Sequence, residues 1–225
     1  MKTLLGVQAR TSSSRLPGKM LMPFGSSSLA SFVMKRCSLL DKLVDDVVLL
    51  TSNERSDDEL AQLISREGFK VFRGSLNNVL LRYIDCANHY KADTVIRVCG
   101  DSPFVDLNMI EIMLNHISEG FDYVSFDPVG NVAGFDSEVV KLESLVKSFN
   151  STQASQDLEH VTPYIRNSCD FKKFQIPAYS LPTNSKLSFT VDDQPSYENA
   201  LRVVKYLNSR IEFDSKEIIN WILKS

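Results

Sequence analysis

The first forty residues contain no aspartate or glutamate, although six lysine and arginine side chains lie there. The whole chain has 25 basic and 28 acidic side chains, a net charge of −3 and a pI near 5.7. A chain with this balance lacks the basic stripe and high pI of a general nucleic-acid binder. The local excess of positive charge instead favours a small polyanion, such as a nucleoside triphosphate, held at one place.

Cysteine and long apolar runs are also scarce. The four cysteines lie far apart, and no pair has the spacing of a zinc site or a redox motif. The apolar stretch after Lys2 is too short for a signal-peptide core, and no run is long enough to cross a membrane. We therefore expect reduced thiols and a cytoplasmic protein with neither a membrane nor a nucleic-acid partner.

No repeat, low-complexity segment or linker divides the 225 residues, which predicts a single domain over residues 1–225. Apolar runs alternate with amphipathic stretches, a pattern typical of crossover units in a mostly parallel α/β sheet. Strands are expected at 3–9, 45–52, 70–74, 93–100, 121–126 and 186–193, and helices at 29–40, 56–68, 77–90, 107–120, 155–167, 195–209 and 214–225. Residues 131–145 are expected to form a loop, a short strand and a helix. Ser56 and Glu59 have capping-box spacing, and Pro163 is expected to interrupt the helix over 155–167.

A basic loop, QARTSSSRLPGKM at residues 8–20, follows the first expected strand. Arg10 and Arg15 can grip phosphate oxygens in pairs, whereas the Lys19 ammonium acts as a compact point charge. Ser12, Ser13 and Ser14 supply hydroxyl donors, and Gly18 lets backbone amides approach closely. Ligands of parallel sheets bind beyond the carboxyl ends of the strands. The loop is therefore predicted to bind phosphates, and a solvated basic loop is the alternative.

Two acidic motifs follow expected strands in the same way, CGDSP at residues 99–103 and FTVDDQP at residues 189–195. Asp101 and one of Asp192 and Asp193 are candidate ligands for Mg²⁺, a hard ion that takes one or two carboxylates together with phosphate oxygens. The alternative is that these aspartates cap a turn or a helix.

Two further motifs are candidates for contacts to a sugar. Asp136 and Glu138 lie in GFDSEV, and His160 follows Glu159 in EHVTPYI. Carboxylates and an imidazole can orient sugar hydroxyls by hydrogen bonding. The alternatives are acidic side chains that face water and a histidine with a structural capping role.

The stretch ARTSSSRLPGKML, residues 9–21, resembles the nucleotide-binding loop of the sugar cytidylyltransferases, especially the 3-deoxy-manno-octulosonate type, in which Thr stands at the position of Ser14. VFRGSLNNVLLRY, VIRVCGDSPFVD, GFDSEV, EHVTPYI and FTVDD are similar to the branch named after spore-coat polysaccharide biosynthesis protein F, and they occur in that branch's order. The resemblance covers about residues 3–205.

The resemblance implies a nucleotide-diphospho-sugar transferase-like three-layer sandwich with a mostly parallel mixed sheet. It also implies Mg²⁺-dependent transfer of CMP from CTP to an acidic sugar for surface glycan biosynthesis, with release of pyrophosphate, and a homodimer. The implied residues are Arg10, Lys19 and Asp101 for catalysis, Ala9, Arg10, Ser14, Arg15, Lys19, Arg73 and Ser75 for CTP, Asp136, Glu138 and His160 for the sugar, and Asp101 and Asp192 for the metal. Arg97 also falls in one of these motifs, which implies a contact to either the nucleotide or the substrate.

The sequence departs from the branch's pattern at three places. Ser102 replaces a cysteine, NVAGFD replaces the usual Pro-Asp-Gly, and VDDQP has one extra residue before Pro195. The extra residue leaves Asp192 and Asp193 as alternatives for the metal, with Asp192 favoured. Two rival functions are a glycosyltransferase, which normally shows an Asp-x-Asp motif absent from this sequence, and a nucleotide-binding protein without catalysis.

Overall fold

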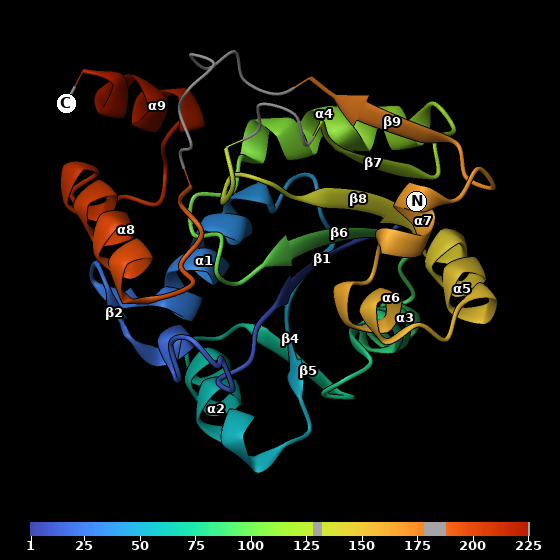
Figure 1. Cartoon of the computed structure of the whole chain (residues 1–225), viewed down its shortest axis with the longest axis horizontal. Coiled ribbons are helices and arrows are strands. Elements are labelled where there is room, and N and C mark those ends of the chain that lie inside the picture. Colours follow the sequence, from blue (N-terminus) through green and yellow to red (C-terminus); the bar gives the residue numbers. More distant parts are fainter. Residues whose placement is uncertain (128–131, 178–187, 225) are drawn as a thin grey trace.

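A seven-stranded mixed sheet forms the centre of the computed structural model, which describes residues 1–127, 132–177 and 188–224 (Figure 1). The strands, in their order across the sheet, are β5 (Lys70–Gly74), β4 (Asp46–Ser52), β1 (Thr3–Gln8), β6 (Thr94–Cys99), β8 (Glu138–Lys141), β7 (Tyr123–Phe126) and β9 (Lys173–Ile176). The first four of these strands are parallel to one another, β8 is antiparallel to β6 and β7, and β9 is parallel to β7. The predicted mostly parallel mixed sheet is confirmed.

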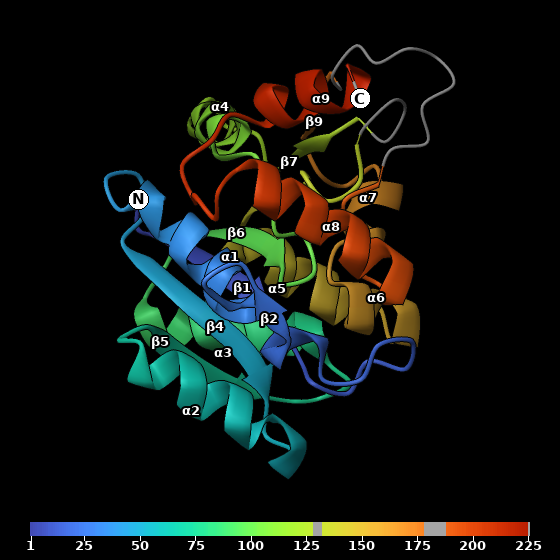
Figure 2. The ribbon, with the colours of Figure 1, turned by 90° about the vertical axis from the view of Figure 1, so that its left-hand side faces the viewer.

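Helices cover both faces of the sheet and complete a three-layer sandwich (Figures 1 and 2). One face packs against α1 (Leu29–Cys37), α2 (Asp58–Arg66), α4 (Leu107–Ser118), α8 (Gln194–Tyr206) and α9 (Ser215–Leu223). The other packs against α3 (Val79–Tyr90), α5 (Leu142–Ser151), α6 (Ser155–His160) and α7 (Pro163–Asn167). Within the described residues, each helix falls short of the length and apolar character that crossing a bilayer requires.

Shorter elements connect the layers. A hairpin of β2 (Pro23–Phe24) and β3 (Ser27–Ser28) precedes α1, and single 3₁₀ turns occur at η1 (Lys19–Leu21), η2 (Ser38–Leu40) and η3 (Arg55–Asp57). Polar side chains begin several helices by accepting a hydrogen bond from the first turn, as Asn78 does for α3 and Asp106 for α4. These caps fix where α3 and α4 begin, so a loop remains between each of the two helices and the strand before it.

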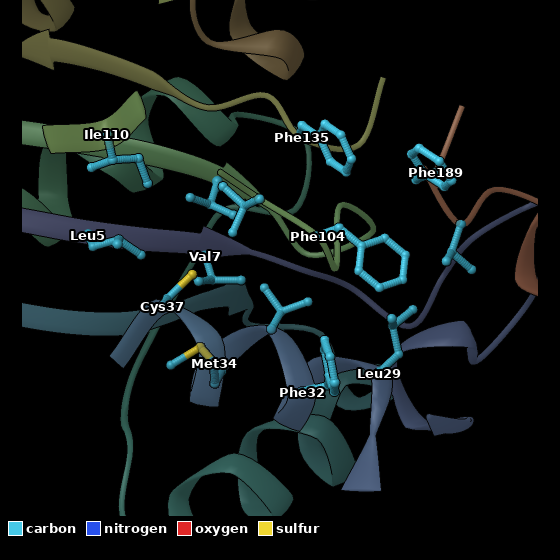
Figure 3. Packing of buried hydrophobic residues seen from close by; sticks show 14 of the residues in the cluster. Leu5, Val7, Leu29, Phe32, Met34, Cys37, Phe104, Ile110, Phe135 and Phe189 are labelled. Carbon is cyan, nitrogen blue, oxygen red and sulfur yellow. The ribbon is translucent and has the colours of Figure 1, made fainter. Parts of the chain in front are cut away.

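An aromatic cluster fills the core beside the carboxyl end of β6 (Figure 3). The Phe104 ring is completely buried, and its centroid lies 6.4 Å from that of Phe32, 5.9 Å from Phe189 and 6.0 Å from Phe213. The cluster therefore joins the loop after β6 to α1, to the segment before α8 and to the segment before α9. This packing fixes the loop ends that carry polar side chains.

Most of the expected elements occur where the sequence predicts them, but the strand expected over 186–193 is wrong. Within its described part, residues 188–193, only Ser188 makes an isolated bridge, to Ala133. The Phe189 N–H donates to the Ala133 carbonyl at 2.7 Å and the Val191 N–H to the Asp101 carbonyl at 2.8 Å. Residues 188–193 thus bond to two separate loops and do not pair with one strand. Residues 131, 186, 187 and 225, which belong to expected segments, lie outside the described residues.

The interruption expected at Pro163 is present, because α6 ends at His160 and α7 begins at Pro163. The strand β9 and the β2–β3 hairpin were not predicted because they are short: β9 alternates polar and apolar residues over only four positions, and β2 and β3 have two residues each.

Phe104→Ala should lower the free energy of unfolding by about 3–5 kcal/mol, because it removes a buried ring and leaves a cavity between four segments. Urea unfolding measures the change. Ile112→Ala is the control, since Ile112 on α4 is 41% exposed and its truncation should cost less than about 0.5 kcal/mol. Equal losses in the two variants would contradict the central place given to Phe104.

Candidate active site

The basic loop after β1 is fastened to the protein at Thr11. Thr11 donates two hydrogen bonds of 2.7 Å to Asp57 Oδ1, one from its backbone N–H and one from Oγ1. Asp57 is completely buried, and its Oδ2 accepts from the Ser52 N–H at 3.2 Å and from the Ser52 hydroxyl. The Gly18 N–H donates to the Thr11 carbonyl at 3.0 Å, and Gly18 has φ +72°, which favours glycine. A single carboxylate therefore holds the loop at one point of its path.

Asp57 is a residue whose role the sequence analysis missed. The capping box predicted for Ser56 and Glu59 is wrong: Asp57 stands at the start of α2, and its side chain makes no hydrogen bond to the helix. Burial alone would raise the pKa of Asp57, but the hydrogen bonds from Ser52 and Thr11 outweigh burial and hold the pKa below its ordinary value. The two adjacent aspartates of the sequence were the available signal, and they are equally typical of a helix start.

The Lys19 ammonium lies between the loop after β6 and the segment before α8. Its Nζ is 2.9 Å from Asp101 Oδ2 and 3.6 Å from Asp192 Oδ1, and it donates to the Val191 carbonyl at 2.7 Å. The Lys19 side chain is only 9% exposed. Because an unpaired buried charge is costly, these three acceptors are what permits the ammonium to lie there.

The two adjacent aspartates before α8 have different surroundings. Asp192 Oδ1 is 2.9 Å from Arg15 Nη2 and faces Lys19. Asp193 caps α8, where its Oδ1 accepts from the Ser196 N–H at 3.0 Å and from the Ser196 hydroxyl at 2.7 Å. Of the two alternatives left open by the sequence, Asp192 is the one that lies beside Lys19.

Asp101 and Asp192 form an oxygen donor set that suits a hard cation, because each directs a carboxylate oxygen at the position of Lys19 Nζ. The side chain of Asp193, next to Asp192 in the sequence, instead caps α8. In residues 1–127, 132–177 and 188–224, no three side chains of histidine, cysteine, aspartate or glutamate converge in a metal-binding group. The two carboxylates therefore fit a cation that takes its other ligands from phosphate oxygens.

These groups border a cavity of about 440 Å³ at the carboxyl ends of β1 and β6. Predicted site residues in its lining are Ala9, Arg10, Ser14, Arg15, Lys19, Asp101, His160 and Asp192. Further lining residues include Gln8, Arg82, Arg97, Cys99 and Glu159. Ligands of parallel sheets bind at this edge, so the structure gathers most of the predicted side chains at one site.

Positive charge predominates in the cavity lining. Five cationic side chains face three carboxylates there; the cations are Arg10, Arg15, Lys19, Arg82 and Arg97, and the carboxylates are Asp101, Glu159 and Asp192. Arg10 Nη2 pairs with Glu159 Oε1 at 3.1 Å, and both side chains are largely exposed. Burial raises the pKa of Cys99 to about 12, so its thiol adds no charge at neutral pH. This balance suits a polyanionic ligand.

Arg73, Ser75 and Asp136, which the sequence also predicts as site residues, are absent from the described lining of this cavity. Arg73 donates to the Ser52 carbonyl at 2.8 Å and pairs with Asp58 at 2.6 Å. The Ser75 hydroxyl accepts from the Asn78 N–H at 3.0 Å, and Asp136 accepts from the Gly134 N–H at 2.8 Å. In the structure these three side chains stabilise loops.

Glu138, the remaining residue predicted to contact a sugar, is engaged by neighbouring side chains. Its Oε1 accepts from the Thr162 hydroxyl at 2.8 Å and from the Tyr123 hydroxyl, and its Oε2 pairs with Arg97 Nη1 at 2.5 Å. Glu138 is 9% exposed and does not line the cavity. Both of its oxygens are thus engaged behind the cavity wall.

Arg82 is a buried cation of the cavity lining that the sequence did not reveal. Its Nε donates to the Ser75 carbonyl at 3.0 Å and its Nη2 to the Leu76 carbonyl at 3.1 Å. Burial lowers the pKa of Arg82 below its ordinary value. Its position on the first turn of α3 made it resemble an exposed helix residue, and only its tertiary contacts show that it shapes the cavity wall.

The family model described as "Cytidylyltransferase" matches residues 6–217. Spore coat polysaccharide biosynthesis protein SpsF of Bacillus subtilis is 32% identical over 228 residues, covering 95% of this chain and 90% of that protein. The structure of a cytidylyltransferase from Leptospira borgpetersenii superposes with a TM-score of 0.92 at 30% identity, covering 100% of this chain and 94% of that one.

A more distant structure shares the fold. A CMP:2-keto-3-deoxy-manno-octonic acid synthetase complexed with CTP superposes with a TM-score of 0.67 at 15% identity, covering 92% of this chain and 99% of that one. The architecture is therefore that of the nucleotidyltransferases with a nucleotide-diphospho-sugar transferase fold. Within that class, the chain belongs to the cytidylyltransferase family.

Asp57→Asn should lower the free energy of unfolding at pH 7 by about 1–3 kcal/mol, because the amide nitrogen cannot accept the hydrogen bonds that the carboxylate accepts. Because the folded pKa of Asp57 is depressed, its contribution is complete above the ordinary aspartate pKa of about 4 and is lost as the pH falls below it. Urea unfolding at neutral and acid pH should show the two proteins converging at low pH. Asp58→Asn, a change at a side chain that is 46% exposed, is the control, and a pH-independent difference for Asp57→Asn would contradict the assignment.

Proposed function

We propose that this protein transfers CMP from CTP to a hydroxyl group of an acidic sugar, giving a CMP-sugar and pyrophosphate for polysaccharide biosynthesis. The observation that carries the proposal is the position of Lys19, which brings the basic loop against the two carboxylates Asp101 and Asp192. Membership of the cytidylyltransferase family supports CTP as the nucleotide. The name of the SpsF relative supports a product used in polysaccharide assembly.

The proposed triphosphate site combines one fixed cation with two adaptable ones. The Lys19 side chain is 9% exposed, whereas those of Arg10 and Arg15 are 40% and 65% exposed. A buried ammonium provides a charge at a defined point, and exposed guanidinium groups can adjust to phosphate oxygens and bind them in pairs. The loop hydroxyls, including that of Ser14, add neutral donors along the same path.

Asp101 and Asp192 are the proposed ligands of Mg²⁺, together with oxygens of the triphosphate. Their carboxylates face one point, which suits a cation that prefers one or two carboxylates with phosphate oxygens. When bound, the ion would neutralise negative charge on the triphosphate and on the departing pyrophosphate. Lys19 would then exchange part of its pairing with these carboxylates for a phosphate oxygen.

In the proposed reaction, the acceptor hydroxyl oxygen forms a bond to the α-phosphorus, and the bond from that phosphorus to the α,β-bridging oxygen breaks. The hydroxyl proton is released, and pyrophosphate leaves with the electron pair of the broken bond. Lys19, Arg10 and Arg15 would stabilise the charge that grows on the pyrophosphate. Positioning and charge neutralisation can supply such catalysis without a covalent intermediate on the protein. His160 is retained as a proposed sugar contact, because it lines the same cavity.

The test is pyrophosphate release from each of the four nucleoside triphosphates with Mg²⁺, against a panel of sugar acids, sugar phosphates and neutral sugars. We expect release with CTP and an acidic acceptor, and about a hundredfold less with the other nucleotides. Release with another nucleotide would contradict the choice of CTP. Consumption of a nucleotide-sugar without pyrophosphate release would instead support a glycosyltransferase.

Asp192→Ala should reduce pyrophosphate release about a hundredfold with little loss of stability, because it removes a carboxylate directed at the phosphates and the metal. Asp193→Ala is the matched control. It should lower the free energy of unfolding by about 1 kcal/mol, the usual effect of losing a helix cap, and keep turnover within about threefold of the wild-type rate. Similar activity losses in the two variants would show that Asp192 has no special place in the reaction.

A further inference from the structure

Arg97 is a charged residue in the middle of an apolar strand. In β6, its neighbours Val95, Ile96 and Val98 are completely buried, and the Arg97 side chain is 13% exposed. Burying a guanidinium there is costly unless it is paired and hydrogen-bonded. Arg97 also lines the cavity, so its charge is directed into the site as well as toward its partners.

The guanidinium of Arg97 is fixed on one side and open on the other. Its Nε donates to Gln8 Oε1 at 3.0 Å and its Nη1 pairs with Glu138 Oε2 at 2.5 Å. Arginine carries five N–H donors. Within residues 1–127, 132–177 and 188–224, Nη2 makes no hydrogen bond, so this end of the fork is available to a ligand in the cavity.

Glu138 holds Arg97 from behind the cavity wall. Its other oxygen accepts from the hydroxyls of Thr162 and Tyr123, so both oxygens of this buried carboxylate are engaged. Burial alone would raise the pKa of Glu138, but the charge of Arg97 and the two hydroxyl donors outweigh burial and hold the pKa below its ordinary value. The carboxylate therefore stays ionised and orients the guanidinium.

The same network reaches His160 through a strained turn. The Thr162 N–H donates to the His160 carbonyl at 2.9 Å, which closes a three-residue turn around Val161. Val161 has φ +74° and ψ −53°, a region that a β-branched residue rarely occupies. Strain of this kind persists where surrounding contacts impose it and often accompanies a functional site. Here the turn lets Thr162 bind Glu138 while His160 lines the cavity.

Arg97 stands apart from the proposed triphosphate groups. It precedes the end of β6 by two residues, about 7 Å along the strand, and lies between Gly6 of β1 and Glu138 of β8. Arg10, Arg15 and Lys19 belong to the loop beyond the strand ends. The cavity thus has a second cationic centre, backed by its own positioning residues.

We propose that Arg97, oriented by Gln8 and Glu138, binds the anionic group of the acceptor and so selects an acidic sugar. This inference rests on the proposed transfer of CMP. A guanidinium fork binds carboxylate and phosphate alike through paired hydrogen bonds. Two sources of the anion are therefore compatible with the site, a sugar acid and a phosphorylated sugar.

The experiment measures acceptor binding without turnover. The protein is saturated with Mg²⁺ and a CTP analogue in which a methylene group replaces the α,β-bridging oxygen. Calorimetry then follows the binding of 3-deoxy-manno-octulosonate, glucose 6-phosphate and glucose. We expect one of the two acidic probes to bind and glucose to bind far more weakly. The probe that binds identifies the carboxylate or the phosphate as the recognised group.

The matched variants are Arg97→Met/Glu138→Gln and Glu138→Gln, which differ only at residue 97. The paired substitution avoids leaving a buried carboxylate without a cation. Relative to Glu138→Gln, the double variant should bind the acidic probe about 10- to 100-fold more weakly and the nucleotide analogue equally well. Arg97→Lys, which keeps the charge but loses the fork, should lie between wild type and the double variant.

Three outcomes contradict parts of this account, and they are distinguishable. Failure of the wild-type protein to bind the nucleotide analogue would overturn the proposed function itself. Nucleotide binding without binding of either acidic probe would overturn the inference about Arg97 alone. Equal binding of the acidic probe by Glu138→Gln and by the double variant would show that another residue recognises the anion.

Discussion

The ion pairing of the buried Lys19 ammonium is the interaction on which the site depends. It joins three segments that are far apart in the sequence: the loop after β1, the loop after β6 and the segment before α8. Because a buried ammonium without acceptors would be strongly destabilising, the segments that carry Asp101, Val191 and Asp192 must be in place whenever Lys19 is. The aromatic cluster around Phe104 packs two of these segments against α1 and so maintains the arrangement.

The acidic side chains of the site fall into two groups, buried and partly exposed. Asp57 and Glu138 are buried carboxylates whose two oxygens are both engaged by protein donors, and each orients a part of the cavity wall. Asp101 and Asp192 are partly exposed and lie where a ligand can reach them. Buried acids thus shape the site, and the accessible ones are the residues proposed to bind the metal. This distinction separates residues with the same side chain into different roles.

The fold could largely be predicted because its signals are local. Buried strands and amphipathic helices alternate, and such alternation requires a mostly parallel sheet with helices on both faces. The basic loop and Asp101 were also predictable, since both follow strands that end at one edge of the sheet. The family resemblance favours Asp192 over Asp193. The strand expected before Asp192 does not form in residues 188–193, because Phe189 and Val191 bond to separate loops.

Other features depend on contacts that no local pattern encodes. A helix-starting aspartate and one that binds Thr11 look identical in the sequence, and only packing distinguishes Asp57. Glu138 lies in a motif that suggests a sugar contact, yet the neighbouring strand places Arg97 opposite it and engages its carboxylate. Arg73 is likewise held by Asp58 and the Ser52 carbonyl, outside the cavity.

The most direct test of the central claim is a crystal structure of the protein with CTP and Mn²⁺, recorded with anomalous data for the metal. The account predicts the triphosphate against Arg10, Arg15 and Lys19, with the anomalous peak between the carboxylates of Asp101 and Asp192. Nucleotide bound elsewhere, or a metal peak away from these two carboxylates, would contradict it.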